Sequence, residues 1–198
     1  MKVKLNDVRL SFANALFEPK QINGLGDPKF SASLVFDPKH PCVADISKAI
    51  QEVCKDKWSA KAKEVYTSLK AADKTCLHDG DSKSEYEGYP GNLYLNASNR
   101  IKPLVIDGNK APLSETDGRP YSGCFVNAVI EIWAQDNQFG KRVNASLSGV
   151  QFLRDGERLS GGGIADADDF EEIPQAPDKR ESGGEVEPVD IFEDDIPF

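Results

Sequence analysis

A long alternating run decides the fold: Tyr121-Ser122-Gly123-Cys124-Phe125-Val126-Asn127-Ala128-Val129-Ile130-Glu131-Ile132-Trp133-Ala134-Gln135-Asp136. Nearly every second side chain is apolar, which is the pattern of a β-strand with one face in a core. The apolar, even-numbered positions are Cys124, Val126, Ala128, Ile130, Ile132 and Ala134. The odd-numbered positions are Tyr121, Phe125, Asn127, Val129, Glu131 and Trp133. We therefore predict a long strand that buries one face and turns aromatic rings to the other.

Three further segments show the same alternation. Residues 93–102 place apolar side chains mainly at odd positions, and polar or basic side chains together with Tyr94 at even positions. Residues 30–36 alternate cleanly, and residues 143–153 do so after a predicted loop at 136–142. We predict a strand for each of these segments.

The first strand is predicted to be bent. Its apolar residues before position 6 share one parity, and Val8, Leu10 and Phe12 then follow the other. Such a change of phase is expected at a β-bulge. Turn-forming residues at 23–28 predict that this strand and residues 30–36 pair as a hairpin.

Helical periodicity interrupts the strands. Apolar residues recur at steps of three and four over residues 43–69, which predicts one long helix or two abutting helices with a break near Trp58-Ser59. The lysines on the opposite face fit a solvated helix surface better than a DNA contact. A bent first strand, several later strands and one helical insert predict a mainly β (α+β) fold, an OB-fold-like curved antiparallel barrel.

Charge divides the chain into a body and a tail. The whole chain has 33 acidic and 24 basic residues, net −9. Residues 165–198 hold 13 acidic and two basic residues, net −11, which leaves residues 1–164 at net +2. Together with glycines and prolines, this charge predicts a disordered acidic tail on a body suited to nucleic acid. The predicted parts are a binding domain at 1–160, a flexible acidic linker at 161–190 and a terminal tip at 191–198.

Catalytic and metal-binding classes find little support. No nucleophile, P-loop or metalloprotease motif accompanies the two histidines. The start of a calcium loop at Asp79-Gly80-Asp81 lacks the required later glycine and ligand. Histidines and cysteines could supply zinc ligands if the fold brought them together, but they lack the two-residue cysteine spacing usual for zinc. These residues are His40, Cys42, Cys54, Cys76 and His78. We predict a protein that is not an enzyme and has no metal or cofactor.

The cellular compartment is predicted from the missing membrane and leader segments and from the spacing of the cysteines. It contains neither an apolar run long enough to span a bilayer nor a charged, apolar leader. The four cysteines have no paired spacing, as expected in a reducing environment. We predict a soluble cytoplasmic protein without a membrane partner.

The last residues, 191–198, combine acidic side chains with an apolar end. Such a tip suits a pocket that is apolar at its base and basic at its rim. The tip resembles the C-terminal tip of bacterial single-stranded DNA-binding proteins (SSBs), which docks onto replication and repair enzymes. The resemblance implies a partner-binding site formed by Asp194, Asp195, Ile196, Pro197 and Phe198.

The body resembles the SSBs of tailed phages, which implies an OB-fold, an acidic tail and the cytoplasm of a bacterial host. The resemblance is carried by Gly91-Asn92-Leu93-Tyr94-Leu95-Asn96-Ala97, Tyr121-Ser122-Gly123-Cys124-Phe125-Val126-Asn127-Ala128, Ile132-Trp133-Ala134-Gln135-Asp136-Asn137 and Gly149-Val150-Gln151-Phe152. The large helical insert departs from bacterial SSBs. Their tetramer is therefore not carried over, and a homodimer stays open.

Binding of single strands requires basic side chains along the phosphates and flat rings for the bases. The outward candidates are Lys4, Arg9, Tyr94, Arg100, Lys102, Tyr121, Phe125, Trp133, Lys141 and Arg142. Arg100 and Lys102 are favoured, since a basic pair beside Tyr94 on one strand face is seldom needed for structure alone. For each aromatic candidate, a second small core under the helix is an equal alternative.

These features predict a sequence-nonspecific SSB that coats strands in phage replication or recombination and recruits enzymes through its tail. A second hypothesis is an adaptor or decoy that occupies SSB-docking pockets of host enzymes without binding DNA. A third is a strand-annealing recombination protein. Replacing Arg100 and Lys102 separates the first two, because a decoy loses nothing.

Overall fold

The computed structural model describes residues 1–22 and 25–159. Within them, eight strands form one sheet, ordered β4-β5-β3-β1-β7-β8-β6, with β2 paired to β3. The strands are β1 (Lys2–Ser11), β2 (Lys20–Ile22), β3 (Leu25–Phe36), β4 (Leu77–Asp79), β5 (Leu93–Asn99), β6 (Leu104–Ile106), β7 (Phe125–Asn137) and β8 (Gly140–Arg154). The helices are α1 (Cys42–Trp58) and α2 (Ala62–Ala71), with short 3-10 turns η1 (Ala13–Leu16), η2 (Ser59–Lys61), η3 (Gly80–Lys83) and η4 (Glu115–Asp117). The predicted linker at 161–190 and tip at 191–198 lie outside the described residues.

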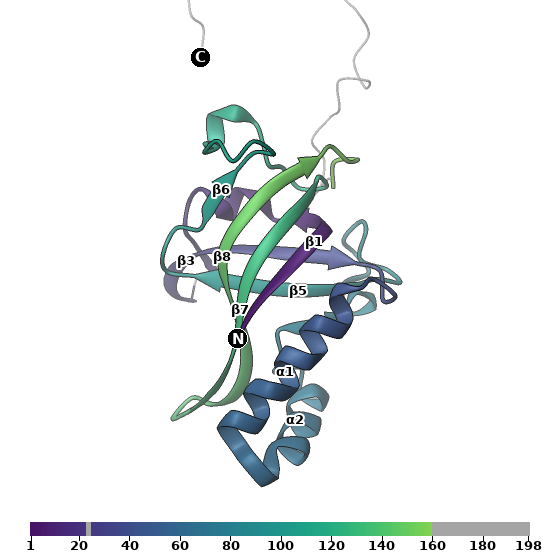
Figure 1. Cartoon of the computed structure of the whole chain (residues 1–198), viewed down its shortest axis with the longest axis vertical. Coiled ribbons are helices and arrows are strands. Elements are labelled where there is room, and N and C mark those ends of the chain that lie inside the picture. The colour runs from purple at the N-terminus through teal and green to yellow at the C-terminus, as the bar shows by residue number, and fades with distance from the viewer. Residues whose placement is uncertain (23–24, 160–198) are drawn as a thin grey trace, which may run out of the picture. The chain divides into compact units, whose positions relative to one another are not determined.

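The sheet is strongly curved, so that β1, β7 and β8 cross over β3 and β5 (Figure 1). Part of the bend lies in β1, whose pairing with β7 shifts between Leu5 and Val8, where Asp7 takes a φ of 52°. β5 also approaches β8, and there the Asn99 side-chain amide donates to the Leu147 carbonyl at 3.0 Å. The predicted OB-fold-like barrel with a bulged first strand is confirmed.

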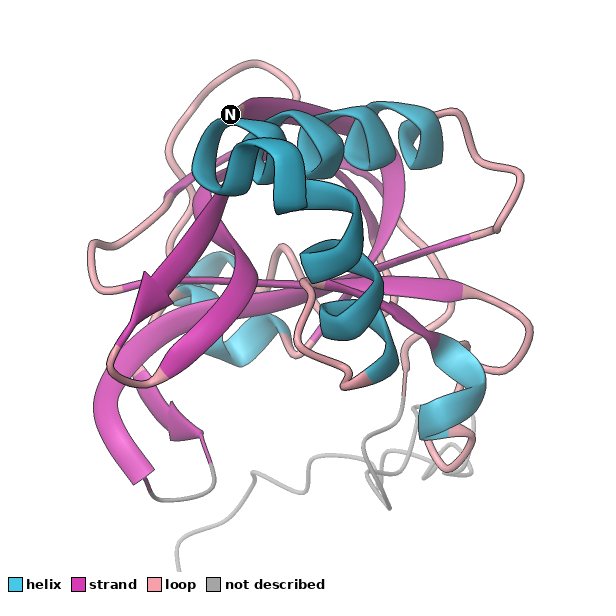
Figure 2. Cartoon of the chain, turned by 90° about the horizontal axis from the view of Figure 1, so that it is seen from below, coloured by secondary structure: helices cyan, strands magenta, loops and turns pink. Residues whose placement is uncertain are grey.

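The two helices lie together at one end of the sheet (Figure 2). The short turn η2 separates them, which confirms the break predicted near Trp58-Ser59. Ile46 and Ile50 of α1 are buried in the same core as strand residues such as Leu34 and Ile130. One continuous core therefore joins the helical insert to the inner face of the sheet.

The sheet differs from the predicted one in its connections. The long strand begins at Phe125, so Tyr121 precedes it. The loop predicted at 136–142 is a tight turn at residues 138–139, because both strands continue their pairing to Asn137 and Gly140. β3 begins at Leu25, inside the segment predicted as a turn.

Three short strands, β2, β4 and β6, and one strand end were also not foreseen. β6 runs parallel to β8, so the barrel is not purely antiparallel. β5 ends at Asn99, which places Arg100 and Lys102 beyond the strand rather than on its Tyr94 face. Neither helix in the described ranges has the length and apolar character needed to cross a membrane.

Candidate nucleic-acid interface

One face of the sheet carries a row of side chains that crosses six strands. Cross-strand partners point to the same side of a sheet, so successive pairings define the row. From β4 to β8, its members are His78, Tyr94, Val35, Arg9, Phe125 and Arg154. A basic side chain thus stands between an aromatic group on β5 and another on β7.

Arg9, at the centre of the row, is oriented by backbone carbonyls. Its Nε donates to the Gly123 carbonyl at 3.3 Å and its guanidinium donates to the Glu157 carbonyl at 2.9 Å. Neither acceptor carries a formal charge. These two bonds therefore hold the direction of the guanidinium without setting a negative charge against it.

On the β7–β8 side of Arg9, arginine side chains cover the aromatic rings. The guanidinium of Arg154 lies 3.5 Å from the centre of the Phe125 ring, and that of Arg158 lies 4.3 Å from the Tyr121 ring. The Tyr121 hydroxyl donates to Asp155 at 3.0 Å, and burial raises its pKa. A ligand that approaches this part of the face therefore meets the guanidinium groups of Arg154 and Arg158 before it meets the Phe125 and Tyr121 rings.

On the β5 side, Tyr94 is covered as well. It packs with Val35 and Tyr89 in a small cluster separate from the main core, and its exposure is 3%. The His78 ring stacks on it at 4.9 Å. Burial raises the pKa of Tyr89, and the nearby Ser11 and Ser33 hydroxyls oppose that rise without reaching hydrogen-bond geometry. Tyr94 therefore lies on the predicted face but is not an exposed ring, because it belongs to a second small core that residues 80–92 cover instead of the helix.

Sequence reasoning missed the cation that lies beside this cluster. The Lys83 ammonium lies 4.8 to 5.8 Å from the centres of four rings, which belong to Phe12, Tyr86, Tyr89 and Tyr94. The segment around Lys83 has neither strand nor helix periodicity, and the parity of Phe12 predicted a core position. The three-residue spacing of Lys83, Tyr86 and Tyr89 was the available signal.

The remaining predicted residues lie away from the centre of the row. Lys4 is exposed opposite Val129, further along β1. Arg100 is paired with Asp27 at 2.6 Å, and Lys102 is exposed in the loop after β5.

A further group lies on the β7–β8 hairpin, near its turn. The Trp133 ring nitrogen donates to the Ser146 hydroxyl at 3.0 Å. Lys141 and Arg142 are exposed at the start of β8. The structure therefore brings Arg9 together with Phe125, but separates them from this group and from Arg100.

Comparison with known proteins places the chain in a family. Residues 1–181 match the family model described as Enterobacter phage Enc34, ssDNA-binding protein. The chain belongs to this family of phage SSBs. A protein of Acyrthosiphon pisum secondary endosymbiont phage 1, "Putative protein p50", is 48% identical over 183 residues, which cover 91% of this chain and 98% of that protein.

Solved structures of phage SSBs share the fold of this Enc34-family protein. The SSB of bacteriophage Enc34 in complex with ssDNA is 25% identical, with a TM-score of 0.68 over 80% of this chain and 89% of that chain. The SSB gp2.5 of bacteriophage T7 is 14% identical, with a TM-score of 0.53 over 87% of this chain and 98% of that chain. At that identity, the T7 protein shows the fold alone.

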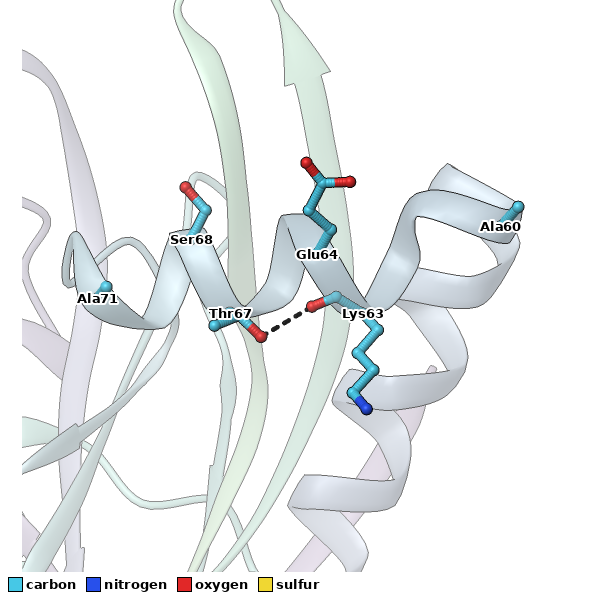
Figure 3. Close-up of a pocket in the computed structure, with 6 residues that line it drawn as sticks. All are labelled: Ala60, Lys63, Glu64, Thr67, Ser68 and Ala71. Atoms are coloured by element: carbon cyan, nitrogen blue, oxygen red, sulfur yellow. Dashed lines mark hydrogen bonds between the residues drawn. The ribbon is translucent and has the colours of Figure 1, made fainter.

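The Enc34-family protein has a shallow pocket on α2, but its lining does not suit a small molecule (Figure 3). Its residues are Ala60, Lys63, Glu64, Thr67, Ser68 and Ala71. All six come from α2 and the turn before it, so no second element forms an opposite wall. The Thr67 hydroxyl is already bonded to the Lys63 carbonyl at 2.9 Å. Small-molecule sites are normally concave and enclosed.

Within residues 1–22 and 25–159, the histidines and cysteines of this protein do not gather into a metal site. His40 contacts Cys42 at 3.0 Å, whereas His78 pairs with Asp73 at 2.6 Å. All four cysteines are buried and free. Burial raises the pKa of Cys42 and Cys76 to about 12, so both thiols stay protonated at neutral pH.

Proposed function

We propose that this Enc34-family protein binds single-stranded DNA without sequence preference, across the face that carries Arg9. The row that places Arg9 between aromatic groups carries the proposal, in a chain that belongs to a family of phage SSBs. Basic side chains neutralise phosphates and release counterions, and flat groups stack on bases of any identity. The role is one of binding, with no catalytic step.

The family and the acidic tail support a proposal for the biological setting. The protein coats strands exposed during phage replication or recombination, in the cytoplasm of the bacterial host. Its acidic tip, with Asp194, Asp195 and Phe198, docks onto replication or repair proteins. The charge split supports a second effect of the tail, since a segment of net −11 competes with DNA for a body of net +2.

Fluorescence anisotropy of labelled oligo(dT) over a salt series tests the proposal. The full chain is compared with a 1–164 truncation and with the variant Arg9→Gln. We expect tight binding by the full chain, weaker binding as salt rises, tighter binding after truncation and weaker binding by Arg9→Gln.

Each outcome has its own meaning. Absence of binding by both the full chain and the truncation overturns the function and favours the adaptor hypothesis. Equal affinity of the two lengths overturns only the competition by the tail. Full affinity of Arg9→Gln moves the interface away from the row.

A further inference from the structure

Two exposed aromatic rings lie together just beyond the C-terminal end of β1. Phe12 is 42% exposed and Tyr86 is 37% exposed. Their ring centres are 5.5 Å apart, with planes at 71°. An edge-to-face pair holds both rings in place, and both rings stay partly exposed. Rings in this arrangement suit a flat ligand.

The backbone of Phe12 explains why its ring is outside. Phe12 has φ 59° and ψ 43°, the left-handed conformation that bulky residues rarely adopt. A regular strand would place position 12 on the same face as Val8 and Leu10, which are fully buried. The next residue, Ala13, is anchored by a 3.0 Å bond from its N–H to the Ser122 hydroxyl. The chain therefore holds an unfavourable conformation that keeps an aromatic ring at the surface.

The other rings on this side of the sheet are less exposed than Phe12 and Tyr86. Phe125 lies under Arg154, and Tyr121 lies under Arg158. Tyr89 and Tyr94 have exposures of 0% and 3%. Phe12 and Tyr86 are therefore the most exposed of these six rings.

Lys83 supplies a positive charge at the same place. Its ammonium lies 5.6 Å from the centre of the Phe12 ring and 5.7 Å from that of Tyr86. An ammonium next to two exposed rings matches the phosphate of a nucleotide whose base is stacked there.

We infer that Phe12 and Tyr86 form a nucleobase-stacking subsite and that Lys83 contacts the adjoining phosphate. The inference rests on the proposed binding of single strands and names the residues that hold the bases. Stacking is indifferent to base identity, so the subsite adds affinity without sequence preference. It also assigns the stacking to rings other than Tyr94, Tyr121 and Phe125.

The test compares Phe12→Leu and Tyr86→Leu with wild type, using the full chain. Phe139→Leu is the matched control, because Phe139 is 77% exposed at the β7–β8 turn, away from the subsite. Each protein is titrated with oligo(dT) and with an abasic oligonucleotide of the same length, which retains phosphates but lacks bases. We expect Phe12→Leu and Tyr86→Leu each to weaken oligo(dT) binding about five- to 150-fold while abasic binding is unchanged. Phe139→Leu should match wild type on both ligands.

Lys83 is tested through the dependence of affinity on salt. Lys83→Gln should lower the slope of log affinity against log salt by about one, on both oligonucleotides, whereas Lys83→Arg should retain the wild-type slope. A wild-type slope for Lys83→Gln overturns the phosphate contact.

The outcomes separate the subsite from the function it rests on. If wild type fails to bind oligo(dT), the proposed function is wrong. If wild type binds and both leucine variants bind oligo(dT) equally well, the subsite is wrong. Equal losses on oligo(dT) and on the abasic strand also overturn the subsite, because they indicate a structural role. Thermal unfolding checks each variant, and Tyr86→Leu decides alone if Phe12→Leu does not fold.

Discussion

The guanidinium of Arg154 lies over Phe125, 3.5 Å from the ring centre, and also donates to Asp7 at 2.8 Å. The outermost group at this point of the row is therefore a cation, although the alternation of β7 predicts an aromatic one. A guanidinium plane on a ring can pair with a phosphate or stack on a base. Loss of the ring itself should matter less than loss of the arginine that covers it.

We predict that Arg154→Gln weakens binding to oligo(dT) and lowers the salt slope by about one, since one phosphate contact is lost. Phe125→Leu should have a smaller effect than Phe12→Leu, because its ring is already covered. Anisotropy titrations over a salt series measure both. Arg100→Gln is the informative comparison, because Arg100 lies beyond the end of β5 and outside the row. If Arg100→Gln lowered the salt slope and Arg154→Gln did not, the interface would lie at the end of β5 instead of on the row.

Gly80→Ala should disturb the segment that carries Lys83 and Tyr86. A Cβ atom at position 80 would collide with the backbone carbonyl oxygens of Tyr89 and Asn92. We expect the collision to lower the free energy of unfolding by about 1–3 kcal/mol. Binding to oligo(dT) should also weaken, because Lys83 and Tyr86 are displaced. Chemical denaturation and anisotropy measure the two effects.

Gly108→Ala serves as its control, since a Cβ there meets no atom within 4 Å. It should leave both stability and binding unchanged. If Gly80→Ala were as stable as wild type, the close packing of Gly80 against the Tyr89 and Asn92 carbonyls would be contradicted.

Trp58 joins the helical insert to the β7–β8 hairpin. Its ring nitrogen donates to the Asp136 carboxylate at 2.8 Å, and Trp58 itself is buried. Asp136→Ala leaves that donor without its partner, so we expect a loss of about 1–2 kcal/mol and a fall in Tm of about 2–6 °C. Asp136→Asn retains an acceptor and should lose less. Differential scanning calorimetry decides, and equal Tm values for wild type and Asp136→Ala would contradict the role of this bond.

The cysteines should be unreactive in the native protein. Burial raises the pKa of Cys42 and Cys76 to about 12 and that of Cys124 to about 11, and it also raises the pKa of Cys54. The thiolate is the reactive form, so at about pH 8 a thiol reagent should modify the native chain slowly and the chain in concentrated guanidinium chloride rapidly. Because the folded state holds these protons more tightly than the unfolded state, raising the pH from about 9 towards 12 should destabilise the fold. Fast modification of native protein at pH 8 would contradict the burial of these thiols.

Local patterns in the sequence are enough for much of the architecture. The alternation over residues 121–136 predicts β7, and the three- and four-residue spacing over 43–69 predicts α1 and α2 with their break at Trp58-Ser59. The change of parity after Leu5 predicts the bulge in β1. Each of these features depends on the backbone geometry of consecutive residues, which composition and spacing report directly.

The interface depends on more than local pattern. Alternation correctly places Arg9, Tyr94 and Phe125 on the outer face of their strands, but strand register decides that Arg9 and Phe125 are neighbours. Whether an outward ring is exposed depends on segments far away in the chain: residues 80–92 cover Tyr94, and Arg154 covers Phe125.

By itself, the sequence determined the strands, the helical insert and the charge division of the chain, because these follow from local spacing and composition. Only the tertiary structure decided which rings are free, since that is a property of packing between distant segments. Phe12 is the clearest case. Its parity predicts a core residue, and a single left-handed backbone conformation turns its ring out to the surface beside Tyr86 and Lys83.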